Sequence, residues 1–259
     1  MVSIVIRNKN EADKLQKTLT ILYSQYKEDF DEVILVDNNS TDNSVSIAES
    51  FGVRIITIEN FSYGRATNLG INSAKNNFVL LLSAHAIPIG NSFFKNSIFK
   101  ITQDSNIAGI RYVNSIQNYL RAIENNFVIT DGLQYGLMTA CAMINKNVWN
   151  EIKFDENLPG SEDKKWSIEV LKAGYEIRDI PETYFYFPKR SKKANLLRLK
   201  NETIAQYKLN KKTYPSRIKL ILIFIFNCTI SNTKHFISYI LNEFKLLKLK
   251  FSIYKELKH

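Results

Sequence analysis

The first third of the chain alternates short apolar runs with segments of helical period. Strand-like runs cover residues 2–6, 32–36, 54–58 and 78–82, and helix-like segments cover residues 10–26, 42–51 and 65–75. Apolar strands joined by amphipathic crossovers are typical of a parallel sheet with helices on both faces. The sequence therefore predicts an α/β fold with a Rossmann-like, mostly parallel central sheet.

Charge is distributed unevenly along the chain. Residues 1–188 carry 18 Lys+Arg and 22 Asp+Glu, a net charge of −4, whereas residues 189–259 carry 17 and 3, a net charge of +14. Within the basic segment an apolar stripe recurs every three or four residues, which predicts an amphipathic helix: Phe236, Ile240, Phe244, Leu247 and Phe251. We expect one domain over residues 1–190 and a basic helical extension over residues 191–259.

Three features indicate where the protein resides. Cys141 and Cys228 lack the spacing of a disulfide framework or a metal site, which favours a reducing compartment. No basic region precedes an apolar one at the N-terminus, so no secretory signal is predicted. The longest apolar run, residues 220–226, is shorter than the roughly 20 residues that span a bilayer. We expect a cytoplasmic protein whose membrane contact, if any, is peripheral.

Polar residues follow each of the four predicted strands. These segments are residues 7–10, 37–39, 59–60 and 83–85. Ligands of open parallel sheets bind in the crevice beyond the carboxyl ends of the strands. The sequence therefore predicts a ligand site at this edge, although residues 37–42 taken alone also suit simple helix capping.

Three segments of the chain together resemble the family 2 glycosyltransferases of the GT-A fold. They are Ser-Ile-Val-Ile-Arg-Asn-Lys-Asn-Glu at 3–11, Val-Asp-Asn-Asn-Ser-Thr-Asp at 36–42 and Gly-Arg-Ala-Thr-Asn-Leu-Gly at 64–70. The resemblance covers roughly residues 2–188 and implies a hexosyl- or deoxyhexosyltransferase with a nucleotide-diphosphate sugar donor. In that family Asp37 would bind the base, and the implied donor site comprises Arg7, Asn8, Asn10, Asp37, Asn38, Arg65, Asn68, Ser83 and His85.

The chain departs from the family where an Asp-x-Asp motif normally binds Mn²⁺ or Mg²⁺. It has Ser83-Ala84-His85 there, and one imidazole with one hydroxyl is a poor substitute for two carboxylates. Three roles for His85 stay open: a single metal ligand, a hydrogen-bond donor to phosphate in a metal-free site, or a structural residue. A divalent cofactor and metal independence are therefore both open. Without a metal, Lys189 and Arg190 are candidates to neutralise the diphosphate.

A second acidic segment, Glu162-Asp163, precedes a predicted helix over residues 167–173. The resemblance implies that Asp163 is the general base of an inverting transfer, with Glu162 beside it. Adjacent carboxylates raise each other's pKa, which would suit a base. The alternative is that both residues only complement the dipole of a helix N-terminus. Trp166, one turn further on, is expected to form a wall of the acceptor pocket or part of the core.

The basic extension suggests which partners the protein meets. Lysines beside an apolar stripe suit the inner face of an anionic membrane, which would bring a lipid-linked or other glycan acceptor close. The stripe could instead pack on the body or on a second subunit, and the oligomeric state stays open. Nucleic acid is not an expected partner, because no recognition motif accompanies the charge. A catalytically silent nucleotide-binding or scaffold component of a polysaccharide assembly complex is the alternative function.

Overall fold

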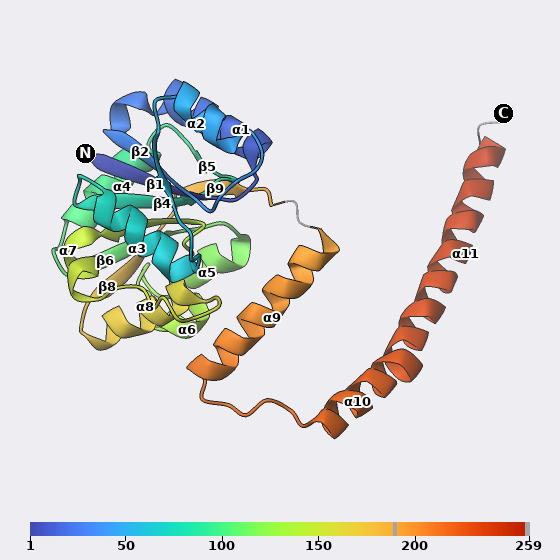
Figure 1. The fold of residues 1–259 in the computed structure, drawn as a ribbon. Coiled ribbons are helices and arrows are strands. Elements are labelled where there is room, and N and C mark those ends of the chain that lie inside the picture. The colour runs from blue at the N-terminus through green and yellow to red at the C-terminus, as the bar shows by residue number, and fades with distance from the viewer. Residues whose placement is uncertain (189–190, 257–259) are drawn as a thin grey trace. The chain divides into compact units, whose positions relative to one another are not determined.

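The computed structural model describes residues 1–188 and 191–256 and divides the chain into two compact units (Figure 1). The first unit comprises Met1–Asn210 and the second Lys211–His259. The first unit thus extends beyond the boundary expected at residue 190, because it includes helix α9 (Lys192–Leu209), whose Ala205 is completely buried.

The elements of the first unit follow the expected alternation and then continue beyond it. Its strands are β1 (Val2–Asn8), β2 (Glu32–Asp37), β3 (Arg54–Thr57), β4 (Phe78–Ser83), β5 (Ala86–Ile89), β6 (Ile107–Tyr112), β7 (Cys141–Asn145), β8 (Glu176–Ile180) and β9 (Thr183–Tyr186). Its helices besides α9 are α1 (Ala12–Gln25), α2 (Ser44–Ser50), α3 (Tyr63–Ser73), α4 (Phe93–Thr102), α5 (Ile116–Glu124), α6 (Gly132–Tyr135), α7 (Lys146–Glu151) and α8 (Glu162–Lys172), with a 3₁₀ turn at Lys27–Asp29.

Seven strands form the central sheet in the order β3-β2-β1-β4-β7-β6-β8. Every neighbouring pair is parallel except the two pairs that involve β7, which runs antiparallel to β4 and β6. The predicted α/β fold with a mostly parallel sheet is therefore confirmed. Strands β5 and β9 form a separate antiparallel pair. They connect the turn after β4 to the segment that precedes α9.

The two faces of the sheet bury separate cores because alternate side chains of a strand point to opposite faces. Ile4 and Ile6 of β1 pack in the core that includes residues of α1, α2 and α4. Val5, between them, packs in the core that includes residues of α3, α7 and α8. Figure 1 shows the helices arranged in these layers around the sheet. The carboxyl ends of β1, β2 and β4 thus meet at one edge.

Helix α3 begins in close contact with the loop after α7, and Gly64 makes this contact possible. A Cβ at position 64 would lie 2.1 Å from the backbone oxygen of Asp155. Real Cβ atoms do not approach a backbone atom so closely, and the carbonyl cannot move like a flexible side chain. Glycine is therefore required here for backbone contact, and the contact fixes the start of α3 against this loop.

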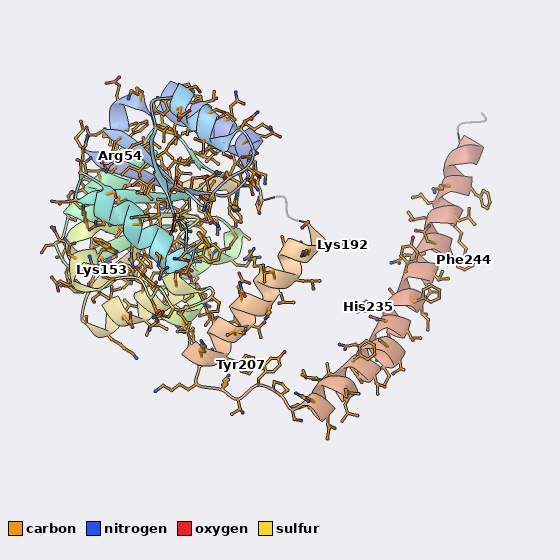
Figure 2. The ribbon with its side chains drawn as sticks, viewed as in Figure 1. Arg54, Lys153, Lys192, Tyr207, His235 and Phe244 are labelled. Carbon is orange, nitrogen blue, oxygen red and sulfur yellow. The ribbon has the colours of Figure 1, made fainter. Side chains whose placement is uncertain are left out.

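The second unit is a helix with a short π-helical turn. It runs through α10 (Arg217–Phe226), the turn Asn227–Ser231 and α11 (Asn232–Glu256). Residues 217–252 are long and apolar enough to cross a membrane by length and composition, which the longest apolar run alone did not indicate. Side chains such as those of His235 and Phe244 project along the helix (Figure 2), and none in the apolar window is buried. One such helix by itself is weak evidence of a membrane span.

Candidate active site

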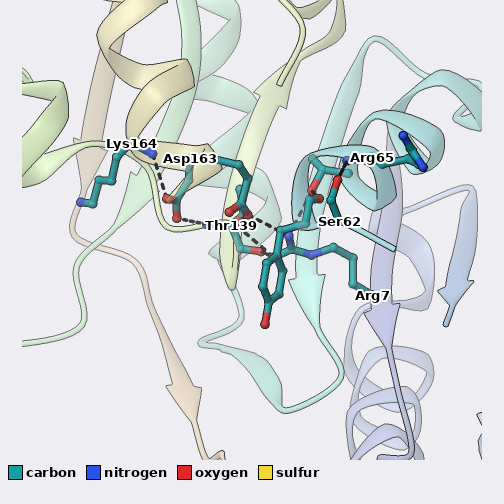
Figure 3. A network of polar contacts seen from close by, with 9 residues as sticks. Arg7, Ser62, Arg65, Thr139, Asp163 and Lys164 are labelled. Atoms are coloured by element: carbon teal, nitrogen blue, oxygen red, sulfur yellow. Dashed lines mark hydrogen bonds and ion pairs between the residues drawn. The ribbon is translucent and has the colours of Figure 1, made fainter. Parts of the chain in front are cut away.

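Arg7 is the centre of a buried polar cluster at the carboxyl end of β1 (Figure 3). Its Nη1 donates hydrogen bonds to Glu162 Oε1 at 3.0 Å and to Thr67 Oγ1 at 3.1 Å. Its Nη2 donates to the carbonyl oxygen of Thr139 at 3.0 Å and to Thr139 Oγ1 at 2.9 Å. The side chains of Arg7 and Glu162 are 10% and 6% exposed. One guanidinium therefore joins β1 to α3, to α8 and to the turn before β7.

Asp163 lies next to this cluster in the first turn of α8. The helix begins at Glu162, so both carboxylates belong to the helix rather than to a preceding turn. Asp163 Oδ2 accepts a hydrogen bond from the backbone N–H of Thr139 at 3.3 Å, and Oδ1 accepts one from the N–H of Lys164 at 2.8 Å. Its side chain is half-buried. Thr139 thus contacts both acids, because its hydroxyl donates to Glu162 Oε1 at 3.0 Å.

Burial dominates the electrostatics of Asp163. Desolvation, with the neighbouring charge of Glu162 as the second cause, raises the pKa of Asp163 from 3.8 to about 6. Lys164 and the backbone N–H donors act in the opposite direction but do not cancel this effect. Burial also lowers the pKa of Lys164, whose side chain extends away from Arg7 in Figure 3. Asp163 therefore has a pKa suited to accepting a proton near neutral pH.

The loops after β1 and β2 are held together by the residues expected to bind a nucleotide. Asp37 is 1% exposed and accepts hydrogen bonds from the Asn8 amide, the Ser40 N–H and the Ser40 hydroxyl. Asn10, in a left-handed conformation, accepts a hydrogen bond from the Thr41 N–H at 2.7 Å. Both carboxylate oxygens of Asp37 thus accept hydrogen bonds from within the protein, and the buried carboxylate stabilises the loop after β2. Asn38 beside it is only half-buried.

Ser83 and His85 lie at the carboxyl end of β4, as expected. His85 Nδ1 is 3.6 Å from Glu11 Oε1, and the imidazole packs 5.2 Å from the ring of Tyr186. Among residues 1–188 and 191–256, no group of three or more His, Cys, Asp or Glu side chains is placed to hold a metal ion. One carboxylate and one imidazole do not fit a metal site built by the protein alone.

Arg65 and Asn68 line a different surface from the Arg7 cluster. Arg65 pairs with Glu156 at 3.2 Å, and Figure 3 shows its guanidinium pointing away from Arg7. Asn68 donates to the Phe154 carbonyl and accepts hydrogen bonds from the Trp149 indole and the Phe154 N–H. Both border an open groove of about 750 Å³. Asn68 is nearly buried and fixes the loop after α7, whereas Arg65 is the more exposed of the two residues.

Trp166 is a core residue. It is completely buried, its indole N–H donates to the Ile152 carbonyl at 2.7 Å, and its ring stacks on Phe154. The expectation that it contacts the acceptor is therefore corrected, because its side chain presents no surface to a ligand. The other expected alternative, a role in the core, is the one observed.

Two further observations complete the comparison with the expected site. Lys189 and Arg190 lie outside the described residues. Thr139 and Glu11 were not expected as site residues: Thr139 precedes an apolar strand, and Glu11 ends the segment that resembles the family but was given no role. Only the register of β1 against β4 and β7 brings Thr139 within reach of Arg7.

Comparison with known proteins identifies the family of this chain. Residues 3–158 match the family model described as Glycosyl transferase family 2. An uncharacterized glycosyltransferase of Methanocaldococcus jannaschii is 21% identical over 89% of this chain and 87% of its own length. A dolichyl N-acetyl-α-D-glucosaminyl phosphate 3-β-D-2,3-diacetamido-2,3-dideoxy-β-D-glucuronosyltransferase of Methanococcus voltae is 23% identical, over 73% of this chain and 67% of the relative.

The fold is also similar to solved GT-A structures. A mannosyltransferase of Pyrobaculum calidifontis, solved with GDP-Man and Mn²⁺, superposes with a TM-score of 0.64 at 18% identity. The similarity covers 83% of this chain and 65% of the mannosyltransferase, so the chain spans just under two thirds of that structure. At this identity the likeness shows the fold alone.

Proposed function

Because the chain belongs to glycosyl transferase family 2, we propose that it is an inverting glycosyltransferase with Asp163 as its general base. It would move a sugar from a nucleotide-diphosphate donor to a hydroxyl of a glycan or lipid-linked acceptor. The acceptor oxygen attacks the anomeric carbon while the bond to the diphosphate breaks on the opposite face. Asp163 takes the hydroxyl proton, and the diphosphate leaves with the electron pair.

The observation that carries this proposal is the setting of Asp163. Its carboxylate is half-buried at the catalytic edge, two backbone N–H groups orient it, and its pKa is raised to about 6. A carboxylate that served only to complement the helix dipole would have its pKa lowered, because the N-terminus of a helix stabilises negative charge. The raised pKa therefore supports the role of a base over that of a simple helix-end anion.

On the donor side, the residues expected to bind the nucleotide have two different roles. Asn8, Asn10 and Asp37 hold the two loops together through their own hydrogen bonds. Asn38, half-buried at the start of the second loop, is the side chain that we propose to face the base. The loop residue Lys9 donates to the Asn38 carbonyl at 2.5 Å and supplies positive charge at this edge.

The diphosphate requires a counter-charge. A divalent cation is consistent with the Mn²⁺ of the mannosyltransferase structure, but the described residues of this chain offer too few ligands to build its site alone. We propose that His85 contributes by hydrogen bonding to the diphosphate, with the carboxylate of Glu11 on its other side. Assays with added Mn²⁺ or with EDTA would show whether a metal also takes part.

We propose that the second unit brings the enzyme to the inner face of an anionic membrane. Residues 211–259 hold ten Lys+Arg and two Asp+Glu, a net charge of +8, next to the exposed apolar side chains of α10 and α11. Such a composition suits shallow insertion with lysines at the headgroups. The Methanococcus voltae relative, whose name describes a dolichyl phosphate-linked acceptor, makes a lipid-linked acceptor the first class to assay.

The test combines nucleotide binding with product formation. UDP, GDP and dTDP should be screened for thermal stabilisation of the full chain with Mn²⁺ and with EDTA, and donor turnover should then be measured for wild type and Asp163→Asn. We expect Asp163→Asn to bind the same nucleotide but to lose about 100-fold or more in turnover. The matched control is Glu169→Gln on the same helix, whose side chain is 40% exposed.

Two outcomes would overturn the proposal. If none of the three nucleotides stabilises the protein, the chain does not bind such a donor. Nucleotide binding without any transfer or donor hydrolysis in wild type would instead favour the silent scaffold.

A further inference from the structure

Arg7 has a different role from the one its sequence position suggested. We propose that Arg7 is a positioning residue, which fixes Glu162 and Thr139 and through them the carboxylate of Asp163, and that it does not bind the nucleotide. This inference rests on the proposed role of Asp163. Its evidence is the set of hydrogen bonds at the end of β1.

The two terminal nitrogens of the Arg7 guanidinium already donate all their hydrogen bonds inside the protein. Nη1 donates to Thr67 and Glu162, and Nη2 donates twice to Thr139. The guanidinium carbon also lies 5.6 Å from the centre of the Tyr63 ring. Its side chain is 10% exposed. A phosphate or base could engage Nη1 or Nη2 only by breaking these hydrogen bonds, one of which is to the charged Glu162.

Arg7 holds the residues around Asp163 in place. Glu162 is the residue directly before Asp163, and its Oε1 accepts hydrogen bonds from both Arg7 and the Thr139 hydroxyl. The N–H of the same Thr139 donates to Asp163 Oδ2. Arg7 therefore holds two residues next to Asp163: Glu162 precedes it along the helix, and Thr139 contacts it across the sheet edge. The orientation of a base within hydrogen-bond reach of its proton determines whether it can act.

Arg7 also has an electrostatic effect on Asp163. Glu162, Lys164 and Arg111 are the charged groups that act on Asp163 from α8 and β6, and Arg7 acts on it through Glu162. Arg7 forms an ion pair with the buried Glu162 and so offsets the negative charge beside Asp163. Without Arg7, the charge of Glu162 would act on Asp163 in full and raise the pKa of Asp163 further.

The experiment compares Arg7→Met and Arg7→Lys with wild type. The matched control is Arg54→Met, an exposed arginine on the edge strand β3 that donates to the Ser73 carbonyl (Figure 2). Three quantities are measured: the Kd for the nucleotide found by thermal shift, kcat for donor turnover, and the pH titration of the labelled Asp163 and Glu162 carboxyl carbons by NMR. The NMR titration needs no activity, so it tests Arg7 even if the proposed transfer is wrong.

For Arg7→Met we expect nucleotide affinity within about threefold of wild type and a loss in kcat of about 100-fold, since a misplaced catalytic group costs that much. The pKa of Asp163 should rise above its wild-type value of about 6. Arg7→Lys keeps the charge but loses the paired geometry, so its titration should stay near wild type while kcat falls.

Unpaired buried charge could unfold Arg7→Met, and the double variant Arg7→Met/Glu162→Gln guards against this because it removes both charges. The double variant should fold, and its midpoint should return to wild type or below. The inference is overturned if Arg7→Met loses nucleotide affinity by tenfold or more and the titration of the pair does not move. That result would make Arg7 a donor ligand.

Discussion

Substituting Asp163 by asparagine should inactivate the enzyme and at the same time stabilise it. The structure raises the pKa of this carboxyl from 3.8 to about 6, which means that the folded protein resists ionisation of the side chain. A shift of about 2 units corresponds to about 3 kcal/mol of folding free energy. Asparagine, which cannot ionise, would not incur this cost.

Because the pKa of Asp163 is raised in the folded protein, its direction of shift determines the pH range in which stability changes. Below pH 3.8 the carboxyl is protonated in both the folded and the unfolded chain and contributes no difference. Between 3.8 and about 6 only the unfolded chain ionises, so wild type loses stability relative to Asp163→Asn as pH rises. Above about 6 the difference is constant. We therefore expect a stability gain for Asp163→Asn that grows to about 3 kcal/mol from pH 4 to 7 and then levels off.

Urea unfolding followed by tryptophan fluorescence measures this difference. The chain has two tryptophans, Trp149 and Trp166, and both are buried in the first unit, so the signal reports the unit that contains Asp163. Comparing the pH dependence, and not one pH value, subtracts any pH-independent effect of the asparagine. A difference that is flat across pH 4–8, or one that favours wild type more as pH rises, would show that burial does not raise this pKa.

Three other predictions concern the same edge of the sheet. The pH profile of kcat/KM should have an acid limb with a midpoint of about 6, and Glu162→Gln should move it to lower pH because a neighbouring negative charge is lost; an unmoved limb would exclude coupling of the two acids. Gly64→Ala should lower the urea midpoint markedly, whereas Gly174→Ser, at an open position with positive φ, tests the milder cost of backbone strain alone. Asn68→Leu should cost about 3 kcal/mol in unfolding free energy, because the Trp149 indole and two backbone groups lose their buried partner; a cost below about 1 kcal/mol would contradict that role.

The strands and the polar strand ends could be predicted because their signals are local. Four apolar runs separated by helical segments match β1 to β4 within a residue or two, and the polar residues after β1, β2 and β4 do gather at one edge. Strands β5 and β8 were not predicted. Residues 86–89 and 176–180 contain proline or charged residues, and they form strands only because a neighbouring strand is present.

The position of side chains within the site could not be predicted, because it depends on contacts between distant segments. Asp37 follows an apolar strand and so was expected to point at a ligand, yet three hydrogen-bond donors from Asn8 and Ser40 surround it. Trp166 was placed beside the acceptor or in the core, and only packing against Phe154 decided for the core. Residue type and spacing identify a loop as functional. They do not say which of its polar groups form hydrogen bonds inside the protein and which can bind a ligand.

Arg7 and Glu162 illustrate why this limit matters for the chemistry. They are 155 positions apart and carry opposite charges, and each has a reasonable local interpretation: a donor ligand after a strand, and an anion at a helix N-terminus. The antiparallel strand β7 lies between β4 and β6 and carries the turn with Thr139 to the same edge as β1. That arrangement brings the two charges together, so that Arg7 forms its ion pair with Glu162 and not with Asp163. In the proposed mechanism, the choice of base is therefore determined less by its own sequence than by which of the two acids the arginine pairs with.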